Sequence, residues 1–373
     1  MSKSYYSLGL MSGTSMDGVD ASIIQSDGKS KYKAILDKYF EYPKDIFKDL
    51  TTLRDKIKSS KDLKRFEKQT KSIEKEITLF HAKAASKIIK KSKLNVDFIG
   101  FHGQTIFHNA EEQISRQIGD GKLLSKLTKK KVVYNFRQND LKNGGQGAPL
   151  TPIFHSILVK QKKIPLPVVI LNIGGITNYT FIDEKGVSSG LDLGPGNCLI
   201  DQWVRLNSKK KYDENGRIAK SGKIKKIILN KALKNFKKKK LIKSSFDVKD
   251  FDISFVRGLS LEDGAATLTE YTSEILYEYL IDPEGGTWES TIIAGGGRKN
   301  KFLIKSIEDK IKSLGTLNSP LKLIDDYGVD GDFIESQAFA YLAIRSYLNL
   351  PISFPETTGV REPCNGGTIV KNF

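Results

Sequence analysis

The stretch from Gly9 to Asp20 constrains the fold of this chain more than any other. Apolar runs at 5–10 and 19–24 predict two buried strands, and the linker between them is rich in glycine, serine, threonine and aspartate. A tight hairpin of this composition directs backbone N–H groups and hydroxyls to one point, which suits a phosphate chain. Its carboxylates offer a place for a hydrated Mg²⁺. Composition alone equally allows an ordinary Gly/Ser/Asp turn.

Two later segments also combine an apolar run with a glycine-rich turn. An apolar run at 168–173 ends in Gly174-Gly175, and another at 291–294 ends in three glycines, 295–297, before a helical pattern. Such glycines let a backbone approach a ligand closely. Neither segment has the glycine spacing of a P-loop or of a dinucleotide fingerprint. Two phosphate hairpins and a strand–glycine–helix segment for the nucleoside instead resemble the layout of the actin/hexokinase superfamily of ATP-dependent phosphotransferases.

The length of 373 residues suggests two domains. Strands alternate with helices and this pattern starts twice, which indicates α/β domains with mixed sheets flanked by helices. We expect a first domain at 1–140 plus about 352–373, and a second at 141–351 with a lysine-rich insert at 205–250. Helical spacing predicts these helices: 62–91 (one long amphipathic helix), 198–206, 262–280, 301–314 and 333–349.

The formal net charge of +18 suggests a polyanion partner, but its distribution argues against nucleic acid. Residues 205–250 hold 15 Lys and 2 Arg against 4 acidic residues, and so carry +13 of this charge. The interleaved aromatic residues of single-strand binders are missing there, which favours a solvated helical face over anion steering or a polyanion partner. The absence of an apolar run of ~20 residues predicts no membrane span. Residues 1–8 lack the apolar core of a secretory signal, so we expect a cytoplasmic protein.

Asp192 is the candidate catalytic residue. It is expected at a strand end, before a turn at 194–196 and a helix cap at Asn197. An exposed carboxylate at the rim of a cleft is a good general base for water or a sugar hydroxyl. The alternative is an aspartate that only organises its turn.

Candidate sugar ligands lie elsewhere in the chain. Arg137 begins a glycine-rich polar loop (135–150) and could bind a carboxylate or phosphate through its guanidinium fork, although the loop could equally be a flexible interdomain connector. His102, in the segment 102–105, could bond sugar hydroxyls, although a single histidine at a strand end is more often structural. Glu335 lies in the first turn of a helix whose expected cap is Asp332, and for both acids composition favours a structural role.

Seven segments, taken in order, resemble the anhydro-N-acetylmuramic acid kinases: 11–20, 101–105, 135–137, 144–150, 172–176, 192–197 and 295–300. The resemblance implies a two-domain actin-like (ribonuclease H-like) fold with an interdomain cleft, and a homodimer. It also implies the ATP- and water-dependent conversion of 1,6-anhydro-N-acetylmuramic acid to N-acetylmuramic acid 6-phosphate, a step of peptidoglycan recycling. Asp192 matches the family's catalytic aspartate, and residues 13–20 match its ATP-binding segment.

The resemblance and the turn interpretation together define the candidate site. Asp17 is expected to hold Mg²⁺ through water. The candidates for the sugar are His102, Arg137, Gly194, Asn197 and Glu335. The candidates for ATP are Gly13, Thr14, Ser15, Met16, Asp17, Gly18, Val19, Asp20, Gly174, Gly175, Gly295, Gly296, Gly297 and Asn300.

The chain departs from the family pattern in two places. Thr177 stands where the family usually has alanine, and residues 241–247 lack the prolines that commonly precede a Lys-Ser pair. The relatives also include kinases of plain anhydro sugars such as levoglucosan. A kinase of another anhydro sugar and a non-catalytic nucleotide-binding sensor therefore remain as alternatives.

Overall fold

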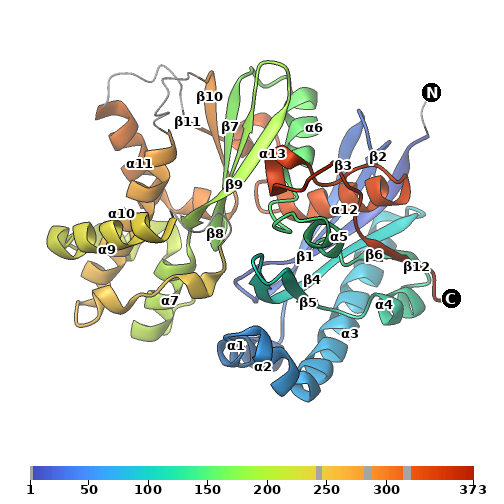
Figure 1. Ribbon diagram of the computed structural model, residues 1–373, viewed down its shortest axis with the longest axis horizontal. Helices are drawn as coiled ribbons and strands as arrows, with labels where there is room; N and C mark the ends of the chain where they lie inside the picture. Colours follow the sequence, from blue (N-terminus) through green and yellow to red (C-terminus); the bar gives the residue numbers. More distant parts are fainter. Residues whose placement is uncertain (1–2, 241–245, 281–287, 314–320) are drawn as a thin grey trace. The chain divides into compact units, whose positions relative to one another are not determined.

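The computed structural model describes residues 3–240, 246–280, 288–313 and 321–373 (Figure 1). The chain forms two compact units. Unit 1 comprises Met1–Ile164 and Asp332–Phe373, and unit 2 comprises Pro165–Gly331.

Unit 1 is built on a sheet of order β12-β6-β4-β1-β2-β3, with β5 paired to β4. The central strand β1 is parallel to β4, which is parallel to β6, whereas β1, β2 and β3 form an antiparallel meander. The strands are β1 (Tyr5–Ser12), β2 (Gly18–Ser26), β3 (Tyr32–Glu41), β4 (Phe98–Asn109), β5 (Ile114–Ile118), β6 (Lys131–Tyr134) and β12 (Thr368–Val370).

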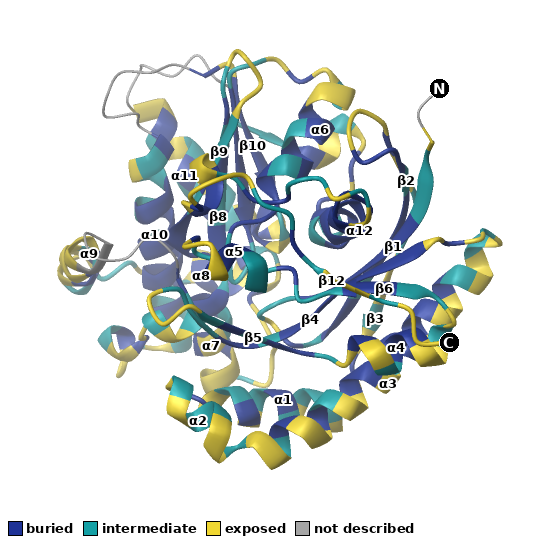
Figure 2. Ribbon diagram, turned by 45° about the vertical axis from the view of Figure 1, so that its right-hand side comes forward, coloured by how far each residue is buried: buried dark blue, intermediate teal, exposed yellow. Residues whose placement is uncertain are grey.

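Helices cover both faces of this sheet. On one face, α3 contributes Ile73, Ile77 and Ile88 to a core shared with β1 and β2. On the other, α12 packs so closely that a Cβ at Gly9 or Gly100 would collide with its backbone, and α12 is buried along nearly its whole length (Figure 2). The helices are α1 (Lys44–Lys56), α2 (Ser60–Arg65), α3 (Glu67–Ser92), α4 (Gly121–Thr128), α5 (Gln138–Lys142), α6 (Pro152–Lys162), α12 (Ile334–Tyr347) and α13 (Pro355–Thr358).

Two details of the predicted helices are corrected. The single helix predicted at 62–91 is interrupted at Phe66, whose backbone leaves the helical conformation and separates the short helix α2 from α3. The start of α2 is marked by a capping box of Ser59 and Asp62. The cap position of α12 is Phe333 rather than Asp332.

Unit 2 is built on a sheet of order β11-β10-β7-β8-β9. The central strand β7 is parallel to β10, which is parallel to β11, and β7, β8 and β9 form an antiparallel meander. The strands are β7 (Val168–Ile173), β8 (Ile176–Ile182), β9 (Ser188–Pro195), β10 (Ser290–Ala294) and β11 (Leu321–Leu323).

One face of this sheet packs against α10 and α11, which contribute Leu276 and Ile307 to the core. The helices of unit 2 are α7 (Cys198–Asn207), α8 (Arg217–Ser221), α9 (Lys226–Lys240), α10 (Leu261–Leu280) and α11 (Lys301–Ser313). Short 3₁₀ turns in unit 2 lie at Glu214–Gly216, Val248–Asp250, Ser254–Val256, Gly296–Lys299 and Ile324–Tyr327.

The two units share one strand topology. In each, the first strand lies between its own antiparallel meander and two strands parallel to it. This is the ribonuclease H-like arrangement occurring twice, so the actin-like α/β fold class predicted from the sequence is confirmed.

The unit boundaries differ from the predicted domain limits. Residues 141–164, which include α6, and the whole of α12 belong to unit 1. The reason is that α12 packs on β1 and β4, as the collisions at Gly9 and Gly100 show. None of the described helices is long and apolar enough to cross a membrane.

Candidate functional site

The predicted phosphate hairpin joins β1 to β2 in unit 1. Its turn is closed by a bond from Met16 N to Gly13 O (3.2 Å), and Gln104 Nε2 donates to the same carbonyl at 2.9 Å. Ser15 Oγ donates to Asp17 Oδ1 at 2.6 Å. Met16 and the following Val19 are buried in the core of unit 1, so among residues 13–20 these two side chains anchor the turn and do not face a ligand.

The two glycines of this hairpin have opposite surroundings. A Cβ at Gly13 would meet nothing nearer than Ser15 Oγ, at 3.9 Å. A Cβ at Gly18 would lie 2.5 Å from Phe40 O and from the ring of Tyr39. Gly13 therefore leaves open space beside the turn, whereas Gly18 is required by the packing of β2 on β3.

A buried polar relay supports the hairpin. Burial lowers the pKa of His81 to about 4, so the ring is neutral. Its Nδ1 lies 2.7 Å from Ile77 O and therefore carries the proton, which makes Nε2 the acceptor for Ser12 Oγ (3.1 Å). Ser12 Oγ in turn accepts from Tyr42 OH at 2.9 Å, and Tyr42 N donates to Asp17 O at 2.8 Å. The relay thus joins both stems of the hairpin to α3.

Arg137 and His102 form a second group in unit 1. Arg137 donates through Nη2 to His102 Nε2 (3.0 Å) and through Nη1 to Gly147 O (2.7 Å). His102 Nδ1 lies 2.8 Å from Gly103 O. Burial, followed by the charge of Arg137, holds the pKa of His102 well below its usual value. His102 is therefore neutral, and it orients the guanidinium of Arg137.

The glycine-rich loop after Arg137 lies wholly in unit 1 and is firmly held. The buried Asp140 accepts from Gly147 N (2.6 Å) and from Thr358 Oγ1 (2.5 Å). Gln146 N donates to Thr358 O at 2.8 Å. The interdomain-connector alternative is therefore wrong for this loop.

Glu335 lies in the first turn of α12 and is partly buried. Ser336 Oγ bonds Ser22 Oγ at 2.6 Å, which fixes the start of the helix on β2. The ring of Phe339, one turn after Glu335, lies 4.5 Å from that of His102. Residues four apart share a helix face, so α12 presents Glu335 on the side where His102 and Arg137 lie.

Asp192 is not the exposed strand-end residue that the sequence suggested. It lies within β9, and its side chain is only 6 % exposed. Its Oδ2 accepts from Phe246 N at 3.1 Å. The strand extends beyond Asp192 because Gly194 and Pro195 continue the pairing with β8.

Asp192 ends a polar row across the sheet of unit 2. Asn172, Asn178 and Asp192 are directly opposite one another on β7, β8 and β9, so their side chains share one face. Tyr179, the residue after Asn178, packs on the core that α10 and α11 form with this sheet. Adjacent residues of a strand point to opposite faces, so the polar row lies on the face away from these two helices. Ala294 of β10 adjoins Asn172. The row therefore lies immediately before the two glycine turns at 174–175 and 295–297.

The turn at Gly174-Gly175 is braced from β9 and α7. The amides of Gly196 and Asn197 donate to Gly175 O (2.9 Å) and Gly174 O (2.8 Å). Asn197 occupies the N-cap position of α7, as predicted, but its side chain makes no capping bond there and donates to Gly174 O (3.2 Å) instead. A Cβ at Gly194 would lie 3.0 Å from Ile275 and from Phe236. Gly194 and Asn197 thus support the turn.

In the second turn, Gly295 and Gly297 pack against β7, whereas a Cβ at Gly296 would meet nothing within 4 Å. Arg298, 5 % exposed, holds this turn through its bonds to Gly295 O (3.0 Å) and to Asp325 (2.6 and 3.0 Å). Asn300 Oδ1 accepts from Leu303 N at 3.0 Å and so caps α11.

The lysine-rich helix α9 has one apolar face. Its Phe236 packs on Phe246, with ring centroids 5.9 Å apart, and Phe246 supplies the amide that bonds Asp192. Lys237 and Lys238 are exposed, as predicted for a solvated face. The departure noted at 241–247 falls mostly on 241–245, which lie outside the described residues.

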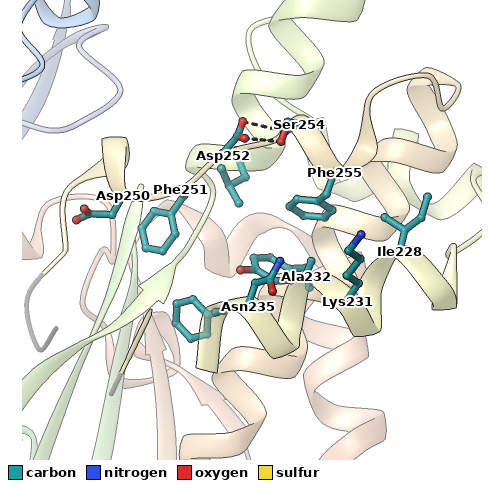
Figure 3. A pocket seen from close by; sticks show the side chains of 12 residues that line it. Ile228, Lys231, Ala232, Asn235, Asp250, Phe251, Asp252, Ser254 and Phe255 are labelled. Carbon is teal, nitrogen blue, oxygen red and sulfur yellow. Dashed lines mark hydrogen bonds between the residues drawn. The ribbon is translucent and has the colours of Figure 1, made fainter. Parts of the chain in front are cut away.

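A cavity of about 520 Å³ opens beside α9 (Figure 3). Its lining includes Lys231, Phe251, Phe255 and Tyr271, with Asp252 bonded to Ser254. None of the candidate site residues lines it.

No group of three or more His, Cys, Asp or Glu side chains is placed to hold a metal within the described parts of the chain. Asp17 and Asp20 nevertheless place two carboxylates close to Tyr39, where β2 begins. Burial first, and then their carboxylates, raise the pKa of Tyr39. A cation bound there would depend on phosphate oxygens and water for its other ligands, as Mg²⁺ commonly does.

Sequence reasoning left several residues of these sites unassigned. Gln104 lies in one of the seven segments but received no nucleotide role, and the contacts of Tyr42 and His81 with Ser12 join distant segments. The pairing of Asn178 with Asp192 could have been suspected from the two short hairpins that join β7, β8 and β9, since hairpin length sets register.

Comparisons with known proteins agree over the whole chain. The family model "Anhydro-N-acetylmuramic acid kinase" matches residues 5–372. A protein of that name from Pelagibacter ubique (strain HTCC1062) is 56 % identical over 382 residues, covering 100 % of both chains. Another, from Zymomonas mobilis, is 39 % identical and covers 97 % of this chain and 98 % of its own. The solved structure of hexokinase from Schistosoma mansoni complexed with glucose aligns with a TM-score of 0.44 at 10 % identity, over 91 % of this chain and 85 % of that one.

Proposed function

The chain belongs to the anhydro-N-acetylmuramic acid kinase family, and we propose that it opens and phosphorylates 1,6-anhydro-N-acetylmuramic acid. It is a kinase, and therefore a phosphotransferase. The products would be N-acetylmuramic acid 6-phosphate and ADP, as peptidoglycan recycling requires. The observation that carries the proposal is the polar row ending at Asp192, which lies beside two glycine turns of unit 2.

Asp192 would act as the general base. Water attacks the anomeric carbon, and its proton moves to the Asp192 carboxylate. The C1–O6 bond breaks, O6 keeps the electron pair and attacks the γ-phosphorus, and ADP leaves. The proton on Asp192 is then released to solvent. The bond from Phe246 N stabilises the ionised carboxylate that a base requires.

The glycine turns would bind ATP. Gly13 and Gly296 leave open space where phosphate oxygens could approach backbone N–H groups, and Gly174 has only Ile176 O nearby, at 3.3 Å. Mg²⁺ bound to the nucleotide would neutralise charge that develops during phosphoryl transfer. Asp17 is the residue proposed to hold this Mg²⁺ through water, and the nearby carboxylate of Asp20, which also acts on Tyr39, supports this choice.

Unit 1 would recognise the sugar through His102, Arg137 and Glu335. The guanidinium of Arg137 is already oriented by His102 and Gly147 O. A cation fixed in this way suits the lactyl carboxylate of a muramyl sugar. Levoglucosan has no such carboxylate, and the muramyl kinase names of the relatives do not favour it as substrate.

Turnover of ATP by the purified protein tests the proposal. We expect ADP release with 1,6-anhydro-N-acetylmuramic acid, and little with levoglucosan or without sugar. Equal turnover with both sugars would refute the muramyl specificity, and nucleotide binding without turnover would favour the sensor. We further propose a cytoplasmic homodimer, on the family resemblance; sedimentation analysis would test the oligomeric state.

A further inference from the structure

Asn178 has an amide oxygen that the fold does not satisfy. Its Oδ1 is buried and has no hydrogen-bond donor among the described residues. Asn178 lies directly opposite Asp192, where Cβ atoms of paired residues are about 4.5–5.5 Å apart. A buried acceptor without a donor is unfavourable and calls for a bound group.

The hairpin between β8 and β9 places these two residues opposite each other. The register runs without a shift from the pair Ile182–Ser188 to the pair Asn178–Asp192. Thr177 then pairs with Gly194, so Leu193 is the extra residue of a bulge directly after this pair. Leu191 and Leu193 pack on the core of unit 2, so Asp192 between them lies on the polar face with Asn178. Bulges are over-represented next to active sites, and this one shifts only the last pairs of β9 with β8.

We propose that Asn178 is a further catalytic residue, and that its Oδ1 and the Asp192 carboxylate hold the attacking water between them. This inference rests on the proposed function. Both groups are acceptors, so they do not bond each other, whereas a water molecule has two protons to donate. One proton is donated to Asn178 Oδ1 and the other, which leaves during attack, to Asp192. A lone pair of the water oxygen is then directed at the anomeric carbon.

The first test is the Asn178→Ala variant. We expect kcat with the anhydro sugar to fall about 10- to 100-fold, because misplacing a reacting group by about 1 Å costs roughly this much. KM for ATP should stay within about twofold. The acid limb of the pH–rate profile should not move, because Asn178 donates nothing to Asp192. Loss of a donor would instead raise the pKa of that carboxylate.

The second test is Asn178→Asp, which keeps an acceptor oxygen and adds a charge. A carboxylate opposite Asp192 should raise the apparent pKa of the pair and shift the acid limb to higher pH. Above that limb, kcat should recover to within about tenfold of wild type. Thr180→Val is the matched control on the same strand and face, and its kcat should equal that of wild type.

The outcomes separate this inference from the proposed function. If the wild-type protein does not turn over the anhydro sugar, the proposed function fails. If the wild type is active and Asn178→Ala has normal kcat, only the role of Asn178 is refuted. An upward shift of the acid limb in Asn178→Ala would also refute it, since Asn178 would then be a donor to Asp192. If Asn178→Ala does not fold, an Asn178→Asp protein that stays inactive at all pH values while melting like wild type overturns the proposal.

Discussion

Replacing Gly13 by valine is expected to weaken ATP binding while leaving unit 1 folded. The space beside Gly13 is open, since the nearest atom to a Cβ at this position would be Ser15 Oγ, at 3.9 Å, and the new Cβ therefore meets no backbone. It would occupy the place where phosphate oxygens approach the turn. Each charge-assisted hydrogen bond lost in this way is worth about 1.5–3 kcal/mol, or about 10- to 150-fold in Kd.

Gly18→Val in the same hairpin is the matched control. There a Cβ would lie 2.5 Å from Phe40 O, so β3 must move. Such overpacking costs about 1–3 kcal/mol, which corresponds to a Tm lower by about 2–12 °C. Calorimetric titration with a non-hydrolysable ATP analogue, together with thermal melting, distinguishes the two effects. Gly13→Val should leave Tm within about 2 °C of wild type. Wild-type nucleotide affinity in Gly13→Val would refute the phosphate-hairpin interpretation.

Other variants test the base, the sugar ligand and the buried histidines. Asp192→Asn keeps size and polarity but removes the base, so kcat should fall ~10²–10⁴-fold; a near-normal kcat would refute the assignment. Arg137→Ala should raise KM for the anhydromuramyl sugar about 10- to 150-fold, whereas changing Lys237–Lys240 to Gln should leave it within about threefold, because the charges of Lys237 and Lys238 are exposed and therefore screened. The reverse result would move sugar capture to α9. The buried His81 and His155 each have a pKa of about 4, below 6.5, so the unfolded chain binds protons first as pH falls. Urea unfolding should therefore show stability falling below about pH 6.5, with a slope of about 1.4 kcal/mol per pH unit for each ring; His81→Gln should reduce the slope, and constant stability from pH 7 to pH 5 would contradict the argument.

The sequence predicted those features that depend on local pattern. Apolar runs followed by glycine located β1, β7, β10 and their turns, and the repeated strand–helix alternation indicated two α/β units. The limits of the units were missed because the chain returns to unit 1 through α12. α12 can pack on this sheet because Gly9 and Gly100 have no Cβ that would collide with its backbone. A glycine within a strand pattern does not indicate in the sequence which element packs against it.

The sequence named the candidate site residues but not their geometry. Asp192 was named as the candidate base, yet its burial was missed because the motif after it looks like a turn. The turn instead lies beyond Pro195, because β9 continues to pair with β8 after a bulge at Leu193 that no local sequence pattern predicts. Likewise Arg137 was named as a candidate sugar ligand, but its orientation by a neutral His102 depends on burial, which the sequence does not show.

The repeated topology also explains why one unit would carry the base. In both units a glycine directly follows the first strand: Gly13 after β1 and Gly174 after β7. A turn at this position is thus a property of the shared fold, and in each unit it would be available to bind phosphate. The third strand differs. In unit 2 it carries a carboxylate on the polar face, opposite an asparagine whose oxygen has no donor in the described chain. The paired turns would therefore account for nucleotide binding, and the bulged third strand of unit 2 for the chemistry on the sugar.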